Sequence, residues 1–389
     1  MVSLLLAIIY MAFISLGLPD SLLGSAWPVM RLALGAPLSF AGVISMIIAG
    51  GTIVSSLLSE RLTRRLGTGL VTAVSVAMTA LALFGFSISG SVAMLCLWAV
   101  PYGLGAGAVD AALNNYVALH YSSRHMSWLH CFWGVGASIS PYIMGAAIAR
   151  SSWQTGYRAV SVIQVILTAG LFLSLPLWKR PQTQGETGAS RPLLGLRGAL
   201  RIPGVPYILL AFFGYCAAET TTGLWASSYL VEARGVDAGT AARFASLFYL
   251  GITFGRFLNG FVADRLGDKR LIRVGVAVMA LGMVMIMLPV ASDIPALAGL
   301  IVIGLGCAPV YPSIIHATPY NFGEANSQAI IGIQMASAYT GSTFMPPLFG
   351  LIASTIGIRL YPFYLAAFAL LLWVMTERVN RLNRAKQGV

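Results

Sequence analysis

Residues 260–270 read GFVADRLGDKR, and a related stretch, SLLSERLTRR, occupies residues 56–65. Both follow long apolar segments. Three further pairs recur at similar distances: GLG at 103–105 and 304–306, GVGASISP at 134–141 with YTGSTFMP at 339–346, and Asp20-Gly24-Trp27 with Glu219-Gly223-Trp225. The four offsets lie between 199 and 205 residues. A period near half the chain length indicates an internal duplication in a parallel orientation, as in many secondary transporters.

The composition places this duplication in a lipid bilayer. Of 389 residues, 58% are hydrophobic and only 9% are charged, and the mean hydropathy is +0.82. A soluble domain carries about 25% charged residues, and a spanning helix needs about 20 mostly apolar residues. We therefore predict an all-α integral membrane protein with about 12 transmembrane helices in two six-helix bundles.

The apolar segments define the expected domain organisation. We predict spans near 3–30, 38–58, 68–88, 92–118, 127–149, 157–177, 205–231, 238–262, 270–290, 293–316, 326–353 and 358–378. Residues 1–178 would form the first bundle and 205–389 the second, with a short basic tail. The polar segment 179–204, rich in Gly and Pro, would be a cytoplasmic linker or a surface helix.

Basic residues predict the orientation, because Lys and Arg accumulate on the cytoplasmic side. With both termini in the cytoplasm, 17 of the 24 Lys and Arg residues lie inside and one lies within a span. The six outer ones are Arg31, Arg150, Arg158, Arg234, Arg243 and Arg359. The net charge of +12 then fits a rim that faces anionic lipid, without nucleic acid. We expect a multi-pass protein of the cell membrane, acting as a monomer.

The stretch at 260–270 resembles the loop signature of the major facilitator superfamily, G-x-x-x-D-R-x-G-x-K-R. Its matching residues are Gly260, Asp264, Arg265, Gly267, Lys269 and Arg270, and Ser56, Glu60, Arg61, Thr63, Arg64 and Arg65 stand in those places in the first half. A small residue allows close helix contact, and an acid can pair with Arg or cap a helix N-terminus. The resemblance implies a conformational latch, which we expect Arg256 to join; the alternative is an ordinary basic loop.

Two stretches are similar to the fucose–proton symporter family within that superfamily. PDSLLGSAWP, at 19–28, resembles the acidic pattern of its first helix, and GLGAGAVDAALNNYV, at 103–117, resembles its fourth helix. In the second stretch Asp110 precedes Asn114 by four residues, and Asp110 stands where the family has Glu. The resemblance implies proton-coupled symport of a sugar-like solute.

Three acids lie deep in predicted spans: Asp20, Asp110 and Glu219. A carboxylate at the bilayer centre costs about 3 kcal/mol on insertion scales, so it normally faces a protein cavity. Desolvation there favours the neutral acid, which can then carry a proton. We predict Asp110 as the main proton-coupling acid, with Asp20 and Glu219 as further ones. The alternative for each is a structural hydrogen bond between helices.

Other polar and aromatic residues are candidates for lining the solute cavity. They are Asn114, Asn115, Trp27, His130, Trp133, Gln334, Tyr311 and Tyr339, with Asn259 and His316 at comparable depth. Aromatic faces with a few polar groups suit small ligands. Trp and Tyr also anchor helices at the membrane surface, and His130 could equally be an interhelical hydrogen-bonding residue.

The remaining residue types argue against an enzyme or an ATP-driven pump. The four cysteines and four histidines show no metal-binding or disulfide spacing, and no nucleophile or phosphate-binding motif occurs. We expect no catalytic residue, metal or cofactor, with a proton gradient as the energy source. The alternatives are proton-coupled efflux and a transporter-like receptor. The segment SPYIMG at 140–145 keeps only the proline of the drug-antiporter signature, which favours uptake.

Overall fold

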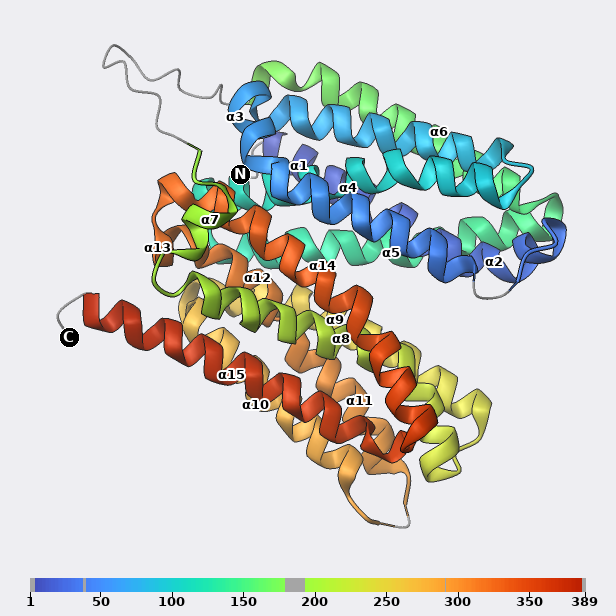
Figure 1. Cartoon of the computed structure of the whole chain (residues 1–389), viewed down its shortest axis with the longest axis vertical. Coiled ribbons are helices and arrows are strands. Elements are labelled where there is room, and N and C mark those ends of the chain that lie inside the picture. Colours follow the sequence, from blue (N-terminus) through green and yellow to red (C-terminus); the bar gives the residue numbers. More distant parts are fainter. Residues whose placement is uncertain (1–3, 38–39, 179–192, 291, 387–389) are drawn as a thin grey trace. The chain divides into compact units, whose positions relative to one another are not determined.

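The computed structural model describes residues 4–37, 40–178, 193–290 and 292–386, and these fold entirely into helices, turns and loops (Figure 1). The first half contains α1 (Leu4–Asp20), α2 (Leu22–Ala33), α3 (Phe40–Ile88), α4 (Val92–His120), α5 (Ser123–Arg150), α6 (Trp153–Leu173) and the 3₁₀ turn η1 (Leu175–Leu177). The short α7 (Gly195–Leu200) follows. The second half contains α8 (Val205–Arg234), α9 (Ala238–Leu266), α10 (Asp268–Met287), α11 (Ile294–Cys307), α12 (Val310–His316), α13 (Thr318–Phe322), α14 (Glu324–Thr355), η2 (Ile358–Leu360) and α15 (Tyr361–Lys386).

The helices confirm the predicted all-α membrane architecture. Among the described residues, eight helices are long and apolar enough to cross a bilayer. The 49-residue α3 covers two predicted spans. The more polar α8, α9 and α14 coincide with three further predicted spans. Most of the predicted linker, residues 179–192, lies outside the described residues, and its end forms α7.

In each half of the chain, one glycine separates the second predicted span from the third. Gly67 has φ 79° and ψ 156° and separates the two parts of α3, whereas Gly267 has φ 73° and ψ 153° and separates α9 from α10. A positive φ of this kind strongly favours glycine. The expectation that Thr63 takes the place of Gly267 is therefore wrong. Gly67, 200 residues before Gly267, has that conformation.

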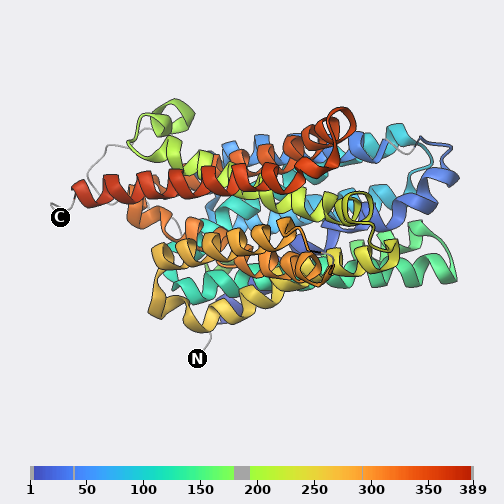
Figure 2. The ribbon, with the colours of Figure 1, turned by 90° about the horizontal axis from the view of Figure 1, so that it is seen from below.

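Contact density divides the chain into two compact units. Unit 1 comprises Met1–Tyr116 and Phe132–Leu196, and unit 2 comprises Val117–Cys131 and Arg197–Val389. The start of α5 thus belongs with unit 2. Within unit 2, α15 runs alongside α8, as Figures 1 and 2 both show. The domain limits at 178 and 205 stay a prediction.

Close helix contacts at glycine repeat between the two halves. A Cβ at Gly103 would lie 2.2 Å from the carbonyl oxygen of Ile48, and one at Gly304 would lie 2.3 Å from that of Phe248. The two glycines are 201 residues apart and their partners 200. Small residues let membrane helices approach this closely. The duplication seen in the sequence is therefore also a duplication of helix packing.

Candidate functional site

Asp20 is the last residue of α1, directly before the turn that leads into α2. The indole N–H of Trp133, on α5, donates to Asp20 Oδ2 at 2.8 Å, and the hydroxyl of Tyr102, on α4, donates to Oδ1 at 3.4 Å. The side chain is exposed. Among the described residues, Asp20 forms no ion pair. Two neutral donors therefore hold an accessible carboxyl group.

Close packing of α1 against α5 positions this carboxyl group. A Cβ at Gly17 would lie 2.1 Å from the carbonyl oxygen of Trp133, and one at Gly136 would lie 2.3 Å from that of Ile14. The hydroxyl of Ser21 also donates to the carbonyl oxygen of Ala137 at 2.7 Å. Because the helices touch at two glycines, the indole of Trp133 reaches the end of α1.

Asp110 lies in the middle of α4 and is buried, with 8% exposure. The side-chain amide of Asn114 donates to Asp110 Oδ1 at 2.8 Å and to the main-chain oxygen of Asp110 at 2.9 Å. The prediction that these two side chains lie next to each other on one helical face is thus confirmed. Tyr102, which donates to Asp20, lies on α4 about two turns before Asp110, so two predicted proton-coupling acids lie in one region of unit 1.

Glu219 has a different environment in unit 2. Arg256 Nη2, on α9, lies 3.8 Å from Glu219 Oε1, on α8, and the arginine is only 3% exposed. Glu219 therefore has a buried cationic partner, unlike Asp20. The expectation that Arg256 joins the loop latch is wrong, because its side chain pairs with Glu219 inside the unit.

Tyr311 lies at the centre of an aromatic cluster beside this ion pair. Its ring centroid is 4.6 Å from those of His130 and Phe212 and 6.0 Å from that of Tyr215. The Arg256 guanidinium carbon lies 5.9 Å from the Tyr311 ring centroid, within cation–π range. The predicted residues His130 and Tyr311 thus come together, and Phe212 and Tyr215 join them. Both were missed because they lie in the apolar first half of α8, where no polar residue singles them out.

The other predicted solute contacts are dispersed. Trp27 packs in an apolar core of unit 1, and Asn115 is buried on α4. The side-chain oxygen of Gln334 accepts from the Thr318 hydroxyl at 3.0 Å. Tyr339 lies farther along α14, half-buried. None of these placements tests a solute contact, so their roles stay predictions.

Asp264 connects the end of α9 to the start of α5 within unit 2. Arg124 Nη2 lies 3.0 Å from Asp264 Oδ2, the main-chain N–H of Arg124 donates to Oδ1 at 3.0 Å, and the Ser122 hydroxyl donates to Oδ2 at 3.1 Å. An acid at a helix N-terminus is stabilised by the free N–H groups and the helix dipole. These contacts are the kind expected of a latch.

Gly260 allows a second contact between the same helices. A Cβ there would lie 2.1 Å from Trp128 Nε1, and that indole N–H donates to the Phe257 carbonyl oxygen at 3.3 Å. Arg265, Lys269 and Arg270 form no ion pair among the described residues. Their role in the latch stays a prediction.

Asp268 and His316 extend this cluster. His316 Nδ1 lies 2.6 Å from Asp268 Oδ2, and His316 Nε2 lies 3.2 Å from the Tyr121 carbonyl oxygen. The Ser123 hydroxyl donates to Asp268 Oδ1 at 2.6 Å. His316 therefore contacts the loop residues, and its expected place in the solute cavity is wrong. The side-chain amide of Asn259, on α9, donates to the hydroxyl oxygen of Ser127, on α5, at 2.7 Å.

Glu60 forms a smaller set of contacts in unit 1. Arg64 Nη2 lies 3.0 Å from Glu60 Oε1, and the main-chain N–H groups of Leu194 and Gly195 donate to the Glu60 carboxylate at 3.2 and 3.4 Å. Arg61 and Arg65 are exposed. Glu60 thus connects α3 to the segment before α7.

Duplicated helix packing, acids within apolar helices and polar clusters between helices are typical of a multi-span membrane transporter. The sequence profile of the Major Facilitator Superfamily matches residues 9–245 and 208–385. The chain therefore belongs to the Major Facilitator Superfamily.

Relatives in this family have varied names. The chain is 23% identical to Bypass of stop codon protein 6 of Saccharomyces cerevisiae, over 93% of this chain and 78% of the relative. It is 24% identical to the probable nitrate/nitrite antiporter NarK1 of Thermus thermophilus, over 85% and 81%. It is 21% identical to the glucose/mannose transporter GlcP of Bacillus subtilis, over 78% and 77%.

Two solved structures show the same fold. FucP, the fucose:proton symporter of E. coli, superposes with a TM-score of 0.79 at 16% identity, over 97% of this chain and 98% of FucP. The proton:xylose symporter XylE superposes with a TM-score of 0.77 at 14% identity, over 97% and 98%. At this level of sequence identity, the similarity establishes only a shared fold.

Proposed function

We propose that this transporter carries a small neutral solute of the sugar class into the cell together with protons, by alternating access. The observation that carries the proposal is the pair of acids in unit 1. Asp20 is accessible and held by the neutral donors Trp133 and Tyr102, and Tyr102 lies on α4 about two turns before the buried Asp110. Two neighbouring carboxyl groups repel each other when both are ionised, which suits the uptake of a proton.

The neighbours of these acids also suit a sugar. Trp133 and Tyr102 place an aromatic ring and a hydroxyl group beside Asp20, and Asn114 supplies an amide beside Asp110. Ligand sites commonly combine aromatic faces with a few polar groups of this kind. The fold shared with FucP and XylE and the similarity to GlcP support the same solute class.

Glu219 takes a different role from the two aspartates in this proposal. Its partner Arg256 keeps a positive charge at any physiological pH, so the pair balances its own charge beside Tyr311. Glu219 and Arg256 would then orient the solute against the aromatic cluster, and Asp110 would carry the proton. Breaking a buried ion pair by removing one partner typically costs 3–5 kcal/mol, so both residues also contribute to stability.

The Asp264 contacts supply the conformational part of the mechanism. Asp264, Arg124 and Ser122 form a compact polar cluster that would hold one transport conformation and separate in the other. The energy would come from the proton gradient across the cell membrane, with both termini in the cytoplasm, and without a cofactor or metal. One charge moving through 100 mV supplies about 2.3 kcal/mol, which is about a 50-fold concentration ratio for a neutral solute.

Accumulation in proteoliposomes tests this function. The purified chain would be reconstituted and supplied with radiolabelled L-fucose, D-xylose or D-glucose under an inward proton gradient. We expect at least one sugar to accumulate above its external concentration and the accumulated sugar to leave when a protonophore is added. Accumulation of no sugar, or sugar entry that stops at equilibrium with the gradient intact, would contradict the proposal. Proton-driven exchange of an anion such as nitrate would instead support antiport.

A further inference from the structure

His316 is the last residue of α12, and both nitrogens of its ring face a hydrogen-bond acceptor. Nδ1 lies 2.6 Å from Asp268 Oδ2, and Nε2 lies 3.2 Å from the main-chain carbonyl oxygen of Tyr121. A neutral imidazole carries one N–H donor, whereas an imidazolium carries two. Of the two forms of the ring, only the imidazolium can therefore donate to both acceptors.

Asp268 matches the imidazolium in charge and in geometry. It is the first residue of α10, and its other carboxylate oxygen, Oδ1, accepts a hydrogen bond of 2.6 Å from the Ser123 hydroxyl. The side chains of His316 and Asp268 are 20% and 17% exposed, so water and salt screen their pairing only in part. Charge-assisted hydrogen bonds are roughly twice as strong as neutral ones. The proton on His316 thus decides whether a strong or a weaker contact joins α12 to α10.

These contacts fasten the loop between α4 and α5, which belongs to unit 2 although α4 begins and α5 ends in unit 1. Asp264 holds this loop with an ion pair and two hydrogen bonds. Asp268 holds it through Ser123, and His316 holds it through Tyr121. Among these side chains, the imidazole of His316 is the one whose charge ordinarily changes near neutral pH.

The helices packed against α12 bring few other charges to this end of it. They include α8, α10, α11 and α13. α11 and α13 contain no charged residue, and α8 contains none before Glu219. The charged residues of α10 all lie near its start, and Arg273 among them pairs with Glu377 at 2.7 Å. They are Asp268, Lys269, Arg270 and Arg273.

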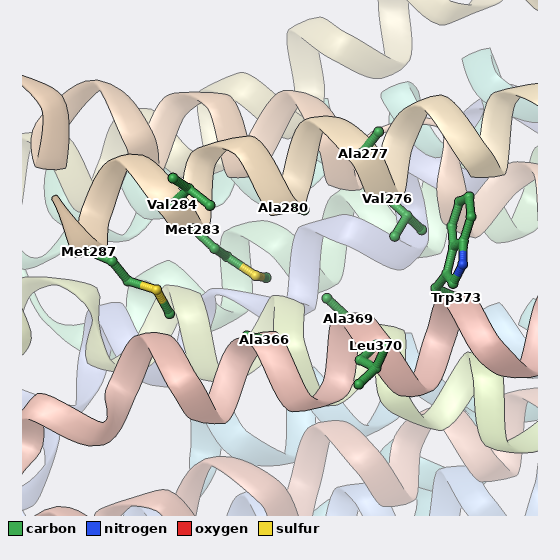
Figure 3. A pocket seen from close by; sticks show the side chains of 10 residues that line it. All are labelled: Val276, Ala277, Ala280, Met283, Val284, Met287, Ala366, Ala369, Leu370 and Trp373. Atoms are coloured by element: carbon green, nitrogen blue, oxygen red, sulfur yellow. The ribbon is translucent and has the colours of Figure 1, made fainter.

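Farther along, α10 is apolar. Val276 and Met283 line a groove there with Trp373 of α15 (Figure 3). The other charged or titratable side chains of α12, of the end of α9 and of the loop region are Tyr311, Asp264, Arg265, His120, Tyr121, Arg124 and His125. Asp264 and Arg124 pair with each other. Asp268 is thus the acid that binds the ring of His316 directly.

We propose that His316 is a pH sensor: its imidazolium fastens the loop between α4 and α5 to α10 and α12, and loss of the proton loosens the loop. The sign follows from the donors. At low pH both acceptors receive an N–H group, and at high pH the neutral ring turns a lone pair toward one of them. For transport, the proposal rests on the alternating-access mechanism, in which the Asp264 contacts of the same loop hold one conformation. A rise in pH on this face, which is cytoplasmic in the predicted orientation, would then weaken that conformation.

Nitrogen NMR with isotope-labelled histidine detects the proton directly in the wild-type chain. The chain has four histidines, and the His316 signals are those that the variant His316→Gln removes. At about pH 6 we expect both ring nitrogens of His316 to be protonated, and at higher pH only one. A neutral His316 ring at about pH 6 would overturn the proposal.

Hydrogen exchange then measures whether the proton fastens the loop. Exchange of residues 117–131 would be followed in detergent at one pH below and one pH above the titration found by NMR, with correction for the intrinsic pH dependence of amide exchange. We expect about fivefold faster exchange of the wild type at the higher pH, because the loss of one hydrogen bond corresponds to about that factor. His316→Gln should exchange fast at both pH values, and His316→Lys, which keeps the charge, slowly at both.

His120→Gln is the matched control, because His120 is an exposed histidine at the end of α4. This variant should keep the response of the wild type to pH. A wild type without a response, a response that persists in His316→Gln, or one that is lost in His120→Gln would each overturn the proposal. Neither measurement requires a solute. A failure to accumulate sugar would therefore contradict the proposed function and leave the proposal about His316 unaffected.

Discussion

The predicted proton-coupling acids differ most in their partners. Asp20 receives hydrogen bonds from an indole and a phenol, Asp110 from the amide of Asn114, and Glu219 pairs with Arg256. Residue type and depth in an apolar segment were enough to select all three acids. Of these contacts, only the one between Asp110 and Asn114 joins residues that are close in sequence, four positions apart. Trp133 is 113 residues from Asp20, so the sequence could not pair them.

Asp20→Asn should weaken solute binding and lower uptake only in part. The asparagine amide keeps one acceptor oxygen, so it loses one of the two hydrogen bonds from Trp133 and Tyr102. A net hydrogen bond contributes about 1 kcal/mol, and we expect the solute Kd to rise about fivefold. Binding would be measured by sugar-induced thermal stabilisation. Asp293→Asn, at a surface ion pair with Arg234, is the control, and an equal effect there would contradict a specific role for Asp20.

Asp264→Asn should slow transport without changing solute affinity. The variant removes the charge that pairs with Arg124 but keeps an oxygen for the N–H group at the start of α5. Since both side chains are partly exposed, the loss is at most about 1 kcal/mol, or about fivefold in the latch equilibrium. Initial uptake rates at several sugar concentrations would show a lower maximal rate with unchanged KM.

The double variant Arg124→Gln/Asp264→Asn completes that test. If the two residues act through their contact, the double variant should be no slower than Asp264→Asn alone, because the interaction is already lost. Additive slowing, or a single variant that transports at the wild-type rate, would show that the contact has no part in the transport cycle.

Much of the helical structure and of the helix packing could be predicted from local sequence patterns. Long apolar segments placed the spans, and the recurring glycines predicted the duplication that the close contacts at Gly103 and Gly304 reproduce. The error at Thr63 arose because several alignments of a short motif were possible. Thr63 was assigned to the position whose backbone conformation belongs to Gly67, because the loop residues of the first half have diverged from the signature.

Gly304→Ala should lower the melting temperature of the purified chain in detergent. Its Cβ would lie 2.3 Å from the Phe248 carbonyl oxygen, so the helices would have to separate, and overpacking of this kind costs about 1–3 kcal/mol. Gly103→Ala should have a similar effect, because its contact with Ile48 is equivalent. Gly145→Ala is the control.

A Cβ at Gly145 has open space around it, and alanine favours helix by about 1 kcal/mol over glycine. The melting temperature of Gly145→Ala should therefore stay the same or rise. If Gly304→Ala were as stable as Gly145→Ala, the close contact would not contribute to packing, and the structural repeat would lose its support.

The family of the whole molecule was predictable because composition, duplication and the loop signature all agree with it. The solute was not predictable, since relatives with similar sequences have different names and the predicted solute contacts come from several helices. His316 illustrates the difficulty. Its place in a predicted span suggested a cavity residue, yet its partners Asp268 and Tyr121 are distant in sequence and lie at the loops.

The distribution of basic residues predicts cytoplasmic termini for the whole chain. A C-terminal fusion to green fluorescent protein should therefore be fluorescent in bacteria, and the same fusion to alkaline phosphatase should be inactive. The first reporter folds on the cytoplasmic side and the second only on the outer side. An active phosphatase with a dark fluorescent protein would contradict the orientation and place the Asp264 cluster on the outer face.

The central claim is that Asp110 couples sugar movement to proton movement. Asp110→Asn keeps an oxygen for the Asn114 amide but has no group that titrates. The decisive measurement records sugar and lumenal pH together in proteoliposomes. With the wild type we expect sugar entry to acidify the lumen. With Asp110→Asn we expect exchange of labelled sugar to continue, without acidification or accumulation. Proton-driven accumulation by Asp110→Asn, or wild-type sugar entry without acidification, would contradict the account.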